Sequence, residues 1–131
     1  MCFDLTAAPL PYDSFDVIVC NHVLEHIPDD IAALREIRRM LAPGGWALLM
    51  SPILVEKTIE DLTLTDPQER LRRFGQEDHV RRYGWDYVDR IREAGLSVEV
   101  VRLEKELPGR DVEGHRLRNV EGVVEPIFIG S

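Results

Sequence analysis

Two short apolar runs, with a helical pattern between them, dominate the first fifty residues of the chain. Residues 15–20 are rich in β-branched side chains and follow turn-forming residues, which predicts a buried strand. Start signals at 28–30, followed by apolar residues at helical spacing, predict a helix that Pro43-Gly44-Gly45 ends. Residues 46–50 are almost continuously apolar, as in a parallel strand covered on both faces. In this order the three elements predict a right-handed βαβ unit.

After residue 52 the apolar residues no longer follow a regular spacing, and a regular spacing returns near residue 85. A short helix is predicted near 67–73, because a capping aspartate, a proline at the first helical position and a carboxylate three residues after the cap stand there. A clearer helix is predicted from Trp85 to Ala94, with Gly95 as its end. The remaining predictions are a partly exposed strand at 98–103, a loop at 104–122 and a last strand at 126–129.

Composition narrows the class of protein. The chain has 131 residues, of which 24 are acidic and 16 basic, giving a formal net charge of -8. This length suits one domain with its own core, and the acidic balance argues against nucleic acid as the main partner. The apolar runs are far shorter than a membrane span, the first twenty residues do not resemble a signal peptide, and Cys2 and Cys20 do not make a disulfide framework. We therefore expect no membrane association and a cytoplasmic location.

Three sequence blocks, in this order and at this spacing, resemble a known family. They occupy residues 10–18, 21–29 and 41–45 and read LPYDSFDVI, NHVLEHIPD and LAPGG. Together they are similar to the class I S-adenosylmethionine-dependent methyltransferases of the ubiquinone/menaquinone-biosynthesis-like group. The resemblance covers residues 3–52 well, and the elements predicted over 84–130 fit the same fold.

The resemblance implies an α/β fold: part of a Rossmann-like methyltransferase sheet with flanking helices, whose last two strands form an antiparallel hairpin. Residues 1–131 would be a single domain, the C-terminal portion of that fold, with residues 53–83 as an insertion on the substrate side. The first two strands of the family sheet, and the G-x-G loop after the first, have no counterpart in the sequence. We therefore expect the N-terminal cofactor-binding half to be missing. The fourth to seventh strands would be residues 15–21, 46–52, 97–103 and 125–130.

S-adenosylmethionine is the cofactor that the resemblance implies, and methyl transfer to a small-molecule acceptor is the implied reaction. By the same resemblance, Asp4 would accept a hydrogen bond from the adenine amino group, and the Leu5 N–H would meet a ring nitrogen. Asn21 and His22, just past the predicted fourth strand, would lie beside the methionine part of the cofactor.

His22 and His79 are the candidate catalytic residues. An imidazole at the position of His22 suits a proton acceptor, because imidazole titrates near neutral pH. Segments similar to residues 74–84 face the substrate in some methyltransferases of this group, so Arg81 and Tyr83 are predicted to recognise an acidic or hydroxylated substrate. Each of these residues also has a structural interpretation, as a histidine bonded to backbone or as a surface loop held by its own salt bridges.

A competing motif lies inside the second block. Residues 22–26 match H-x-x-E-H, in which two histidines bind zinc and the glutamate acts as a base. That chemistry requires a continuous helix, whereas this motif directly follows a strand and Pro28 comes two residues later. We therefore expect no metal site, and His26 is expected to pack locally. A zinc peptidase is the remote alternative function, and a non-catalytic remnant or interaction module with the same fold is the nearer one.

Without the first strand of the family, residues 15–20 would become an edge of the sheet. An apolar edge strand favours association with another chain. The sequence therefore predicts a homodimer, or a complementing chain that supplies the missing half through this edge.

Overall fold

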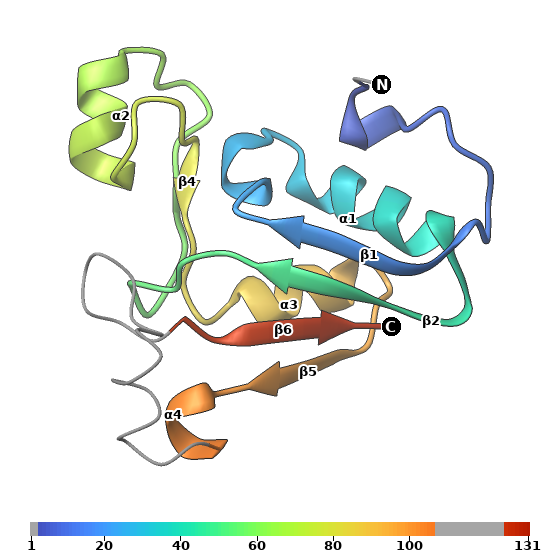
Figure 1. Ribbon diagram of the computed structural model, residues 1–131. Helices are drawn as coiled ribbons and strands as arrows, with labels where there is room; N and C mark the ends of the chain where they lie inside the picture. Colours follow the sequence, from blue (N-terminus) through green and yellow to red (C-terminus); the bar gives the residue numbers. More distant parts are fainter. Residues whose placement is uncertain (1–2, 107–124) are drawn as a thin grey trace.

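A four-stranded sheet forms the centre of the computed structural model, which describes residues 3–106 and 125–131 (Figure 1). Its strands lie in the order β1-β2-β6-β5, and β1 is an edge strand of the described sheet. β1 and β2 are parallel, whereas β6 is antiparallel to both β2 and β5. The predicted α/β class and the antiparallel hairpin are confirmed. The bounds are Phe15–Asn21 for β1, Leu41–Met50 for β2, Val98–Val101 for β5 and Ile127–Gly130 for β6.

Helix α1, Asp30–Met40, connects the two parallel strands. It begins where the sequence predicts, because the Asp29 carboxylate accepts a hydrogen bond of 2.9 Å from the Ala32 N–H. The predicted end at Pro43-Gly44-Gly45 is wrong. The backbone is already extended at Leu41, which caps the helix and begins β2. The helix therefore ends because the chain turns directly into the strand.

Residues 43–45 lie within β2, at an irregularity in its pairing with β1. The register shifts between Phe15, which pairs with Leu41, and Val17, which pairs with Trp46. A Cβ on Gly45 would lie 2.9 Å from the carbonyl oxygen of Asp16. Only glycine lets the two backbones approach this closely.

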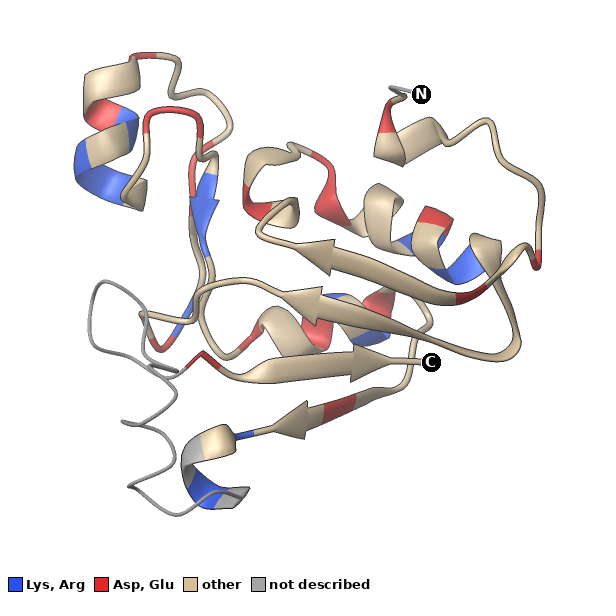
Figure 2. Ribbon diagram, viewed as in Figure 1, with Lys and Arg blue, Asp and Glu red and all other residues tan. Residues whose placement is uncertain are grey.

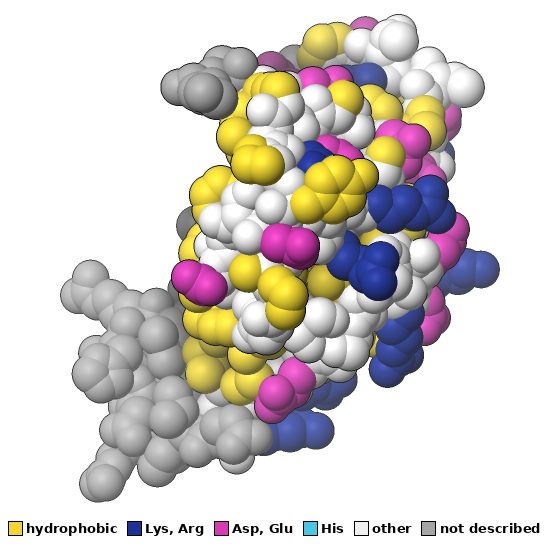
Figure 3. All heavy atoms as spheres, turned by 90° about the vertical axis from the view of Figure 1, so that its right-hand side faces the viewer, with side chains coloured by type: hydrophobic (Ala, Val, Ile, Leu, Met, Phe, Trp, Pro, Cys, Tyr) yellow, Lys and Arg dark blue, Asp and Glu magenta, His cyan; other side chains and the backbone are white. Residues whose placement is uncertain are grey.

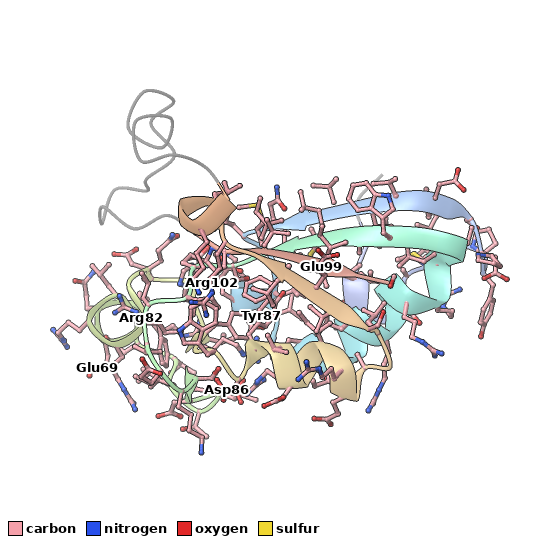
Figure 4. The ribbon with its side chains drawn as sticks, turned by 90° about the horizontal axis from the view of Figure 1, so that it is seen from below. Glu69, Arg82, Asp86, Tyr87, Glu99 and Arg102 are labelled. Carbon is pink, nitrogen blue, oxygen red and sulfur yellow. The ribbon has the colours of Figure 1, made fainter. Side chains whose placement is uncertain are left out.

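Helices α1 and α3, the latter Tyr87–Glu93, cover the same face of the sheet (Figure 4). The opposite face, carrying Val17, Val19 and Trp46, is called the open face below. Val19 is 63% exposed and Trp46 is 41% exposed. The expectations that residues 15–20 form a buried strand and that residues 46–50 are covered on both faces are therefore wrong. In Figure 3 hydrophobic side chains gather on one side of the view, and arginine and lysine side chains gather on the other.

The hydrophobic core lies between the sheet and these two helices. Tyr87, which lies beneath the sheet in Figure 4, meets Phe128 of β6 edge to face, with 5.0 Å between ring centroids. α3 ends as predicted before Gly95, whose φ of 90° suits glycine. Other fully buried core side chains are Ala33, Leu34, Ile37, Ala47, Leu49 and Ile91.

Residues 53–83 leave the sheet and form an excursion beyond the carboxyl ends of β1 and β2 (Figure 1). The excursion contains helix α2, Pro67–Phe74, at the predicted place, and its Asp66 cap accepts a 2.8 Å bond from the Glu69 N–H. Two short strands, β3 (Ile59–Glu60) and β4 (Arg81–Arg82), pair antiparallel within it.

The C-terminal part differs from the prediction in one element. β5 ends at Val101, and the short helix α4, Leu103–Glu106, begins where a strand and then a loop were expected. The predicted loop at residues 107–122 lies outside the described residues. In the described part of the chain, no helix has both the length and the apolar composition that crossing a membrane requires.

Charge follows this architecture. β2 and β6, in the middle of the sheet, contain no charged residue, whereas the helices and the excursion carry both signs (Figure 2). The single-turn 3-10 helices η1 (Leu5–Ala7) and η2 (Leu24–His26) complete the described elements.

Candidate functional site

A pocket of about 250 Å³ opens at the carboxyl ends of β1 and β2, where the excursion faces them. In open α/β sheets this edge is where ligands bind. Four of the predicted site residues line the pocket together: His22, His79, Arg81 and Tyr83. The other lining residues are Glu25, Pro52, Leu54, Phe74, Gly75, Gln76, Arg82 and Glu125.

His22 follows β1 directly and points its imidazole into the pocket region between two carboxylates. Its backbone has a φ of 53°, and its N–H donates to the Met50 carbonyl oxygen at 2.8 Å. Nδ1 lies 3.5 Å from Glu25 Oε1, and Nε2 lies 3.2 Å from Glu125 Oε2. The side chain is about half exposed, with 47% of its surface accessible, so a ligand in the pocket can reach it.

Glu25 forms the inner wall of the pocket and is almost completely buried. Its Oε2 accepts a hydrogen bond of 2.9 Å from the Ser51 hydroxyl. The sequence contained a signal for this residue, the glutamate of H-x-x-E-H, but that motif indicated only a zinc peptidase, which is the remote alternative. Glu25, Arg82 and Glu125 are thus the charged pocket residues that sequence reasoning did not place at this site.

His79 is buried in the wall that the excursion contributes. Its Nδ1 lies 3.2 Å from the Phe74 carbonyl oxygen at the end of α2. Burial lowers the pKa of His79 below its usual value, because the charged imidazolium loses hydration. Its Nε2 is buried without a hydrogen-bond partner among the described residues. The side chain therefore presents a neutral ring with one nitrogen lone pair unused.

Arg81 joins the excursion to the segment after β1. Its guanidinium is fully buried and donates to the carbonyl oxygens of Leu24, Ile27 and Pro28 and to the Glu60 carboxylate. These bonds occupy its donors, so Arg81 fixes the pocket wall from within. Its predicted contact with substrate stays a prediction.

Tyr83 also makes its polar contacts within the protein. Its hydroxyl donates to Asp30 Oδ2 at 2.6 Å. The Arg90 guanidinium also donates to both carboxylate oxygens of Asp30, each at 2.9 Å. Burial and the Asp30 carboxylate raise the pKa of Tyr83 well above its usual value. The phenol therefore stays protonated, and its hydroxyl is used by Asp30.

Asp4, Leu5 and Asn21 do not line this pocket. Asp4 caps η1, where its Oδ1 accepts hydrogen bonds of 2.8 Å from both the N–H and the hydroxyl of Thr6. Leu5 lines a second, apolar cavity of about 320 Å³ that runs along β1. Asn21 is the last residue of β1 and is exposed beside His22.

The H-x-x-E-H residues do not share a helix. η2 holds only Leu24–His26, and His22 precedes it in a left-handed backbone conformation. The two histidines therefore lack the helical spacing that the zinc peptidase motif requires.

Comparison with known proteins agrees with this architecture. The family described as "Methyltransferase domain" matches residues 2–89. YafE, an uncharacterized protein of Escherichia coli, is 31% identical over 94% of this chain and 59% of its own length. A malonyl-[acyl-carrier protein] O-methyltransferase of Halorhodospira halophila is 33% identical over 73% of this chain and 31% of its own length. The structure of an S-adenosylmethionine-dependent methyltransferase from Mesorhizobium loti superimposes with a TM-score of 0.62 at 15% identity, over 98% of this chain and 66% of that one.

The chain therefore belongs to the methyltransferase domain family. Within it, the fold is that of the class I S-adenosylmethionine-dependent methyltransferases, as the sequence blocks predicted. The chain spans less than two thirds of the length of the curated relatives it matches.

Proposed function

We propose that this chain takes part in S-adenosylmethionine-dependent methyl transfer to a small-molecule acceptor, which binds in the pocket at the carboxyl ends of β1 and β2. The observation that carries the proposal is the position of His22. It stands at the end of a parallel strand, in a pocket, with a carboxylate oxygen 3.5 Å from its Nδ1. The family to which the chain belongs supplies the reaction type.

The predicted cofactor contacts fit what the described residues offer. Both bonds from Thr6 use Oδ1 of Asp4, which leaves Oδ2 able to accept from an adenine amino group. Asn21 is exposed at the end of β1 and offers an amide beside His22. When bound, the cofactor supplies an activated methyl group on a sulfonium sulfur. The sequence holds no G-x-G loop for the remaining side of that site.

The pocket residues then have distinct roles in the transfer. His22 accepts the proton of an acceptor hydroxyl or amine, and Glu25 holds the imidazole by its Nδ1. Arg81 and Tyr83 hold the two walls at a fixed separation through their bonds to Leu24 and Asp30, and their recognition of an acidic or hydroxylated substrate stays a prediction. Residues 53–83 thus act as the substrate-side insertion, and the protein excludes water around the reacting atoms.

The open face and the edge of β1 carry the partner proposal. Val17 and Val19 are apolar and exposed, and they lie on an edge strand. The apolar cavity beside them is also lined by Phe3, Leu5 and Phe15. We propose that a second copy of the chain, or a complementing segment with the G-x-G loop, covers this surface and completes the cofactor site. A location in the cytoplasm is consistent with Cys20, which is buried as a free thiol.

Calorimetric titration with S-adenosylhomocysteine, together with the mass in solution, tests the proposal. We expect micromolar binding by an assembly larger than a monomer, and about tenfold weaker binding by Asp4→Asn, which loses a charge-assisted hydrogen bond. Asp89→Asn, on the exposed surface of α3, is the matched control and should bind like the parent chain.

In a preparation that transfers methyl groups, His22→Gln should lower turnover more than ligand affinity.

Absence of binding at millimolar ligand, by the chain alone and by the chain with a complementing segment, would contradict methyl transfer. The non-catalytic module with a methyltransferase fold would then be the better description.

A further inference from the structure

We propose that Glu25, His26 and His79 form a binding site for a divalent cation of the zinc type, in the inner wall of the pocket. Each residue offers one ligand atom, and the three atoms lie within 4.8 Å of one another. The site joins η2, after β1, to the segment between α2 and β4. The proposal does not rest on methyl transfer, because cation binding can be measured without cofactor or substrate.

The two histidines are arranged as metal ligands are. His26 Nδ1 lies 3.2 Å from Asp78 Oδ2, and His79 Nδ1 lies 3.2 Å from the Phe74 carbonyl oxygen. A histidine that ligates a metal through one nitrogen commonly donates its other N–H to a carboxylate or a backbone carbonyl. Both acceptors are present here, and both place the proton on Nδ1. The Nε2 lone pairs of His26 and His79 are then the ones left for a cation.

The buried nitrogen of His79 is the second, independent observation. Its Nε2 has no hydrogen-bond partner in the described part of the chain, although the residue is only 6% exposed. A buried polar atom without a partner is unfavourable by about 1–3 kcal/mol. A bound cation would supply the missing partner. The lowered pKa of His79 agrees with this role, since only a neutral imidazole can ligate a metal.

Glu25 presents the matching electrostatic feature. Glu25 is 2% exposed, and within residues 3–106 and 125–131 its carboxylate contacts the Ser51 hydroxyl and His22 Nδ1, neither of which carries a permanent positive charge. A buried carboxylate without such a charge is unfavourable unless a cation compensates it. The ring centroids of His26 and His79 lie 4.6 Å apart in a T-shaped arrangement, and one nitrogen of each ring lies within 4.8 Å of a Glu25 carboxylate oxygen.

The donor set indicates which cation. Two imidazole nitrogens and one carboxylate oxygen suit zinc and its first-row neighbours, whereas calcium and magnesium prefer oxygen ligands alone. Three protein ligands leave a position open, which is the arrangement of catalytic zinc sites. Glu25 and His79 both line the pocket, so that position faces the ligand space. The expectation of no metal site is thereby replaced, by a ligand set different from that of H-x-x-E-H.

Cobalt(II) reports on such a site directly, because its visible absorption depends on the ligands and the coordination number. The full chain, treated with chelator and then dialysed, is titrated with Co²⁺ and the bound ion is displaced with Zn²⁺. We expect one Co²⁺ per chain with the intense bands of four- or five-coordination, and micromolar or tighter Zn²⁺ binding against a chromophoric chelator.

Substitutions then assign the ligands. Glu25→Gln and His79→Asn should each weaken Zn²⁺ binding by at least about tenfold, a bound set by the loss typical of outer-shell partners. Asp78→Asn changes an exposed residue, so it should fold like the parent chain and still weaken binding about tenfold. Glu77→Gln, the exposed neighbour of Asp78, is the matched control and should change nothing. Circular dichroism confirms that each variant is folded.

Three results would overturn the site. One is the absence of Co²⁺ absorption at millimolar cation. Another is a sulfur-to-cobalt charge-transfer band, which would assign the ion to cysteine. The third is unchanged Zn²⁺ affinity in Asp78→Asn together with Glu25→Gln. Binding of S-adenosylhomocysteine is measured separately, so its failure and the failure of the cation site are distinguishable.

Discussion

The two faces of the sheet are built from the same kinds of side chain but have different surroundings. On the face that α1 and α3 cover, Ala47, Leu49 and Phe128 have no exposed surface. On the open face, their neighbours Val17, Val19 and Trp46 remain between 41% and 63% exposed. Both faces are mainly apolar, although Glu99 of β5 lies on the open face, in register with Ile129. The apolar sequence of a strand therefore shows that its side chains can be buried. Whether they are buried depends on which helices or other chains pack on that face.

The largest expected effect contrasts one residue from each face. Ile91→Ala, on the covered side, should lower the free energy of unfolding by about 2–5 kcal/mol, because it leaves a cavity between α3 and the sheet. Val19→Ala, on the open face, should change it by less than about 0.5 kcal/mol. Urea unfolding at low protein concentration measures both. Equal losses would mean that the open face is covered in solution.

A smaller loss is expected from Gly45→Ala. The added Cβ would lie 2.9 Å from the Asp16 carbonyl oxygen, so β1 must shift away from β2. We expect a loss of about 1–3 kcal/mol in the free energy of unfolding, the range for overpacked sites. Gly44→Ala is a useful comparison, since its Cβ meets no atom within 4 Å but its φ is +83°. If Gly45→Ala unfolds like the parent chain, the tight approach of the two strands is not rigid.

Val19→Lys separates association from stability. A lysine on the open face should leave the free energy of unfolding within about 0.5 kcal/mol and should shift the mass in solution toward the monomer. Light scattering measures the mass. Thr65→Lys introduces the same charge on the exposed excursion and serves as the control. A parent chain that is already monomeric, or an assembly unaffected by Val19→Lys, would exclude this surface as the contact.

The least perturbing comparison uses a thiol on the covered face. Burial raises the pKa of Cys20 to about 12, with the nearby Glu25 charge as a lesser cause. In a Cys2→Ser background, Cys20 of the native protein should therefore react with a thiol reagent at pH 8 only as fast as the protein opens. Urea should accelerate the reaction in parallel with unfolding. Rapid modification of the native protein would show that the covered face is accessible.

Much of the fold could be predicted from the residues alone. The strand at 15–20, the helix from residue 30 and the cap at Asp66 depend on local patterns, and the structure has them in place. The end of α1 could not be predicted, because Pro43 and Gly44 look like a helix stop but belong to an irregular strand. Burial on the open face was also wrong, since alternation in a strand does not reveal which elements will pack on it.

The candidate site likewise has parts that the sequence predicted and parts that depend on tertiary contacts. His22 and Glu25 of the second sequence block meet the 79–83 segment in one pocket. Only the resemblance to the methyltransferase family predicted that these distant segments lie together. The convergence of Glu25, His26 and His79 depends on bringing residues more than fifty positions apart into contact. No local pattern encodes that distance, and the H-x-x-E-H match pointed to His22 as the partner.

The buried guanidinium of Arg81 has a consequence for the energetics of ligand binding. It connects the two walls of the pocket through hydrogen bonds to the carbonyl oxygens of Leu24, Ile27 and Pro28. A ligand entering the pocket therefore meets walls that are already ordered with respect to each other. Little conformational entropy remains to be lost by those walls on binding, so affinity depends mainly on direct contacts and on displaced water. The pocket is preorganised by one side chain that makes its hydrogen bonds to the protein itself.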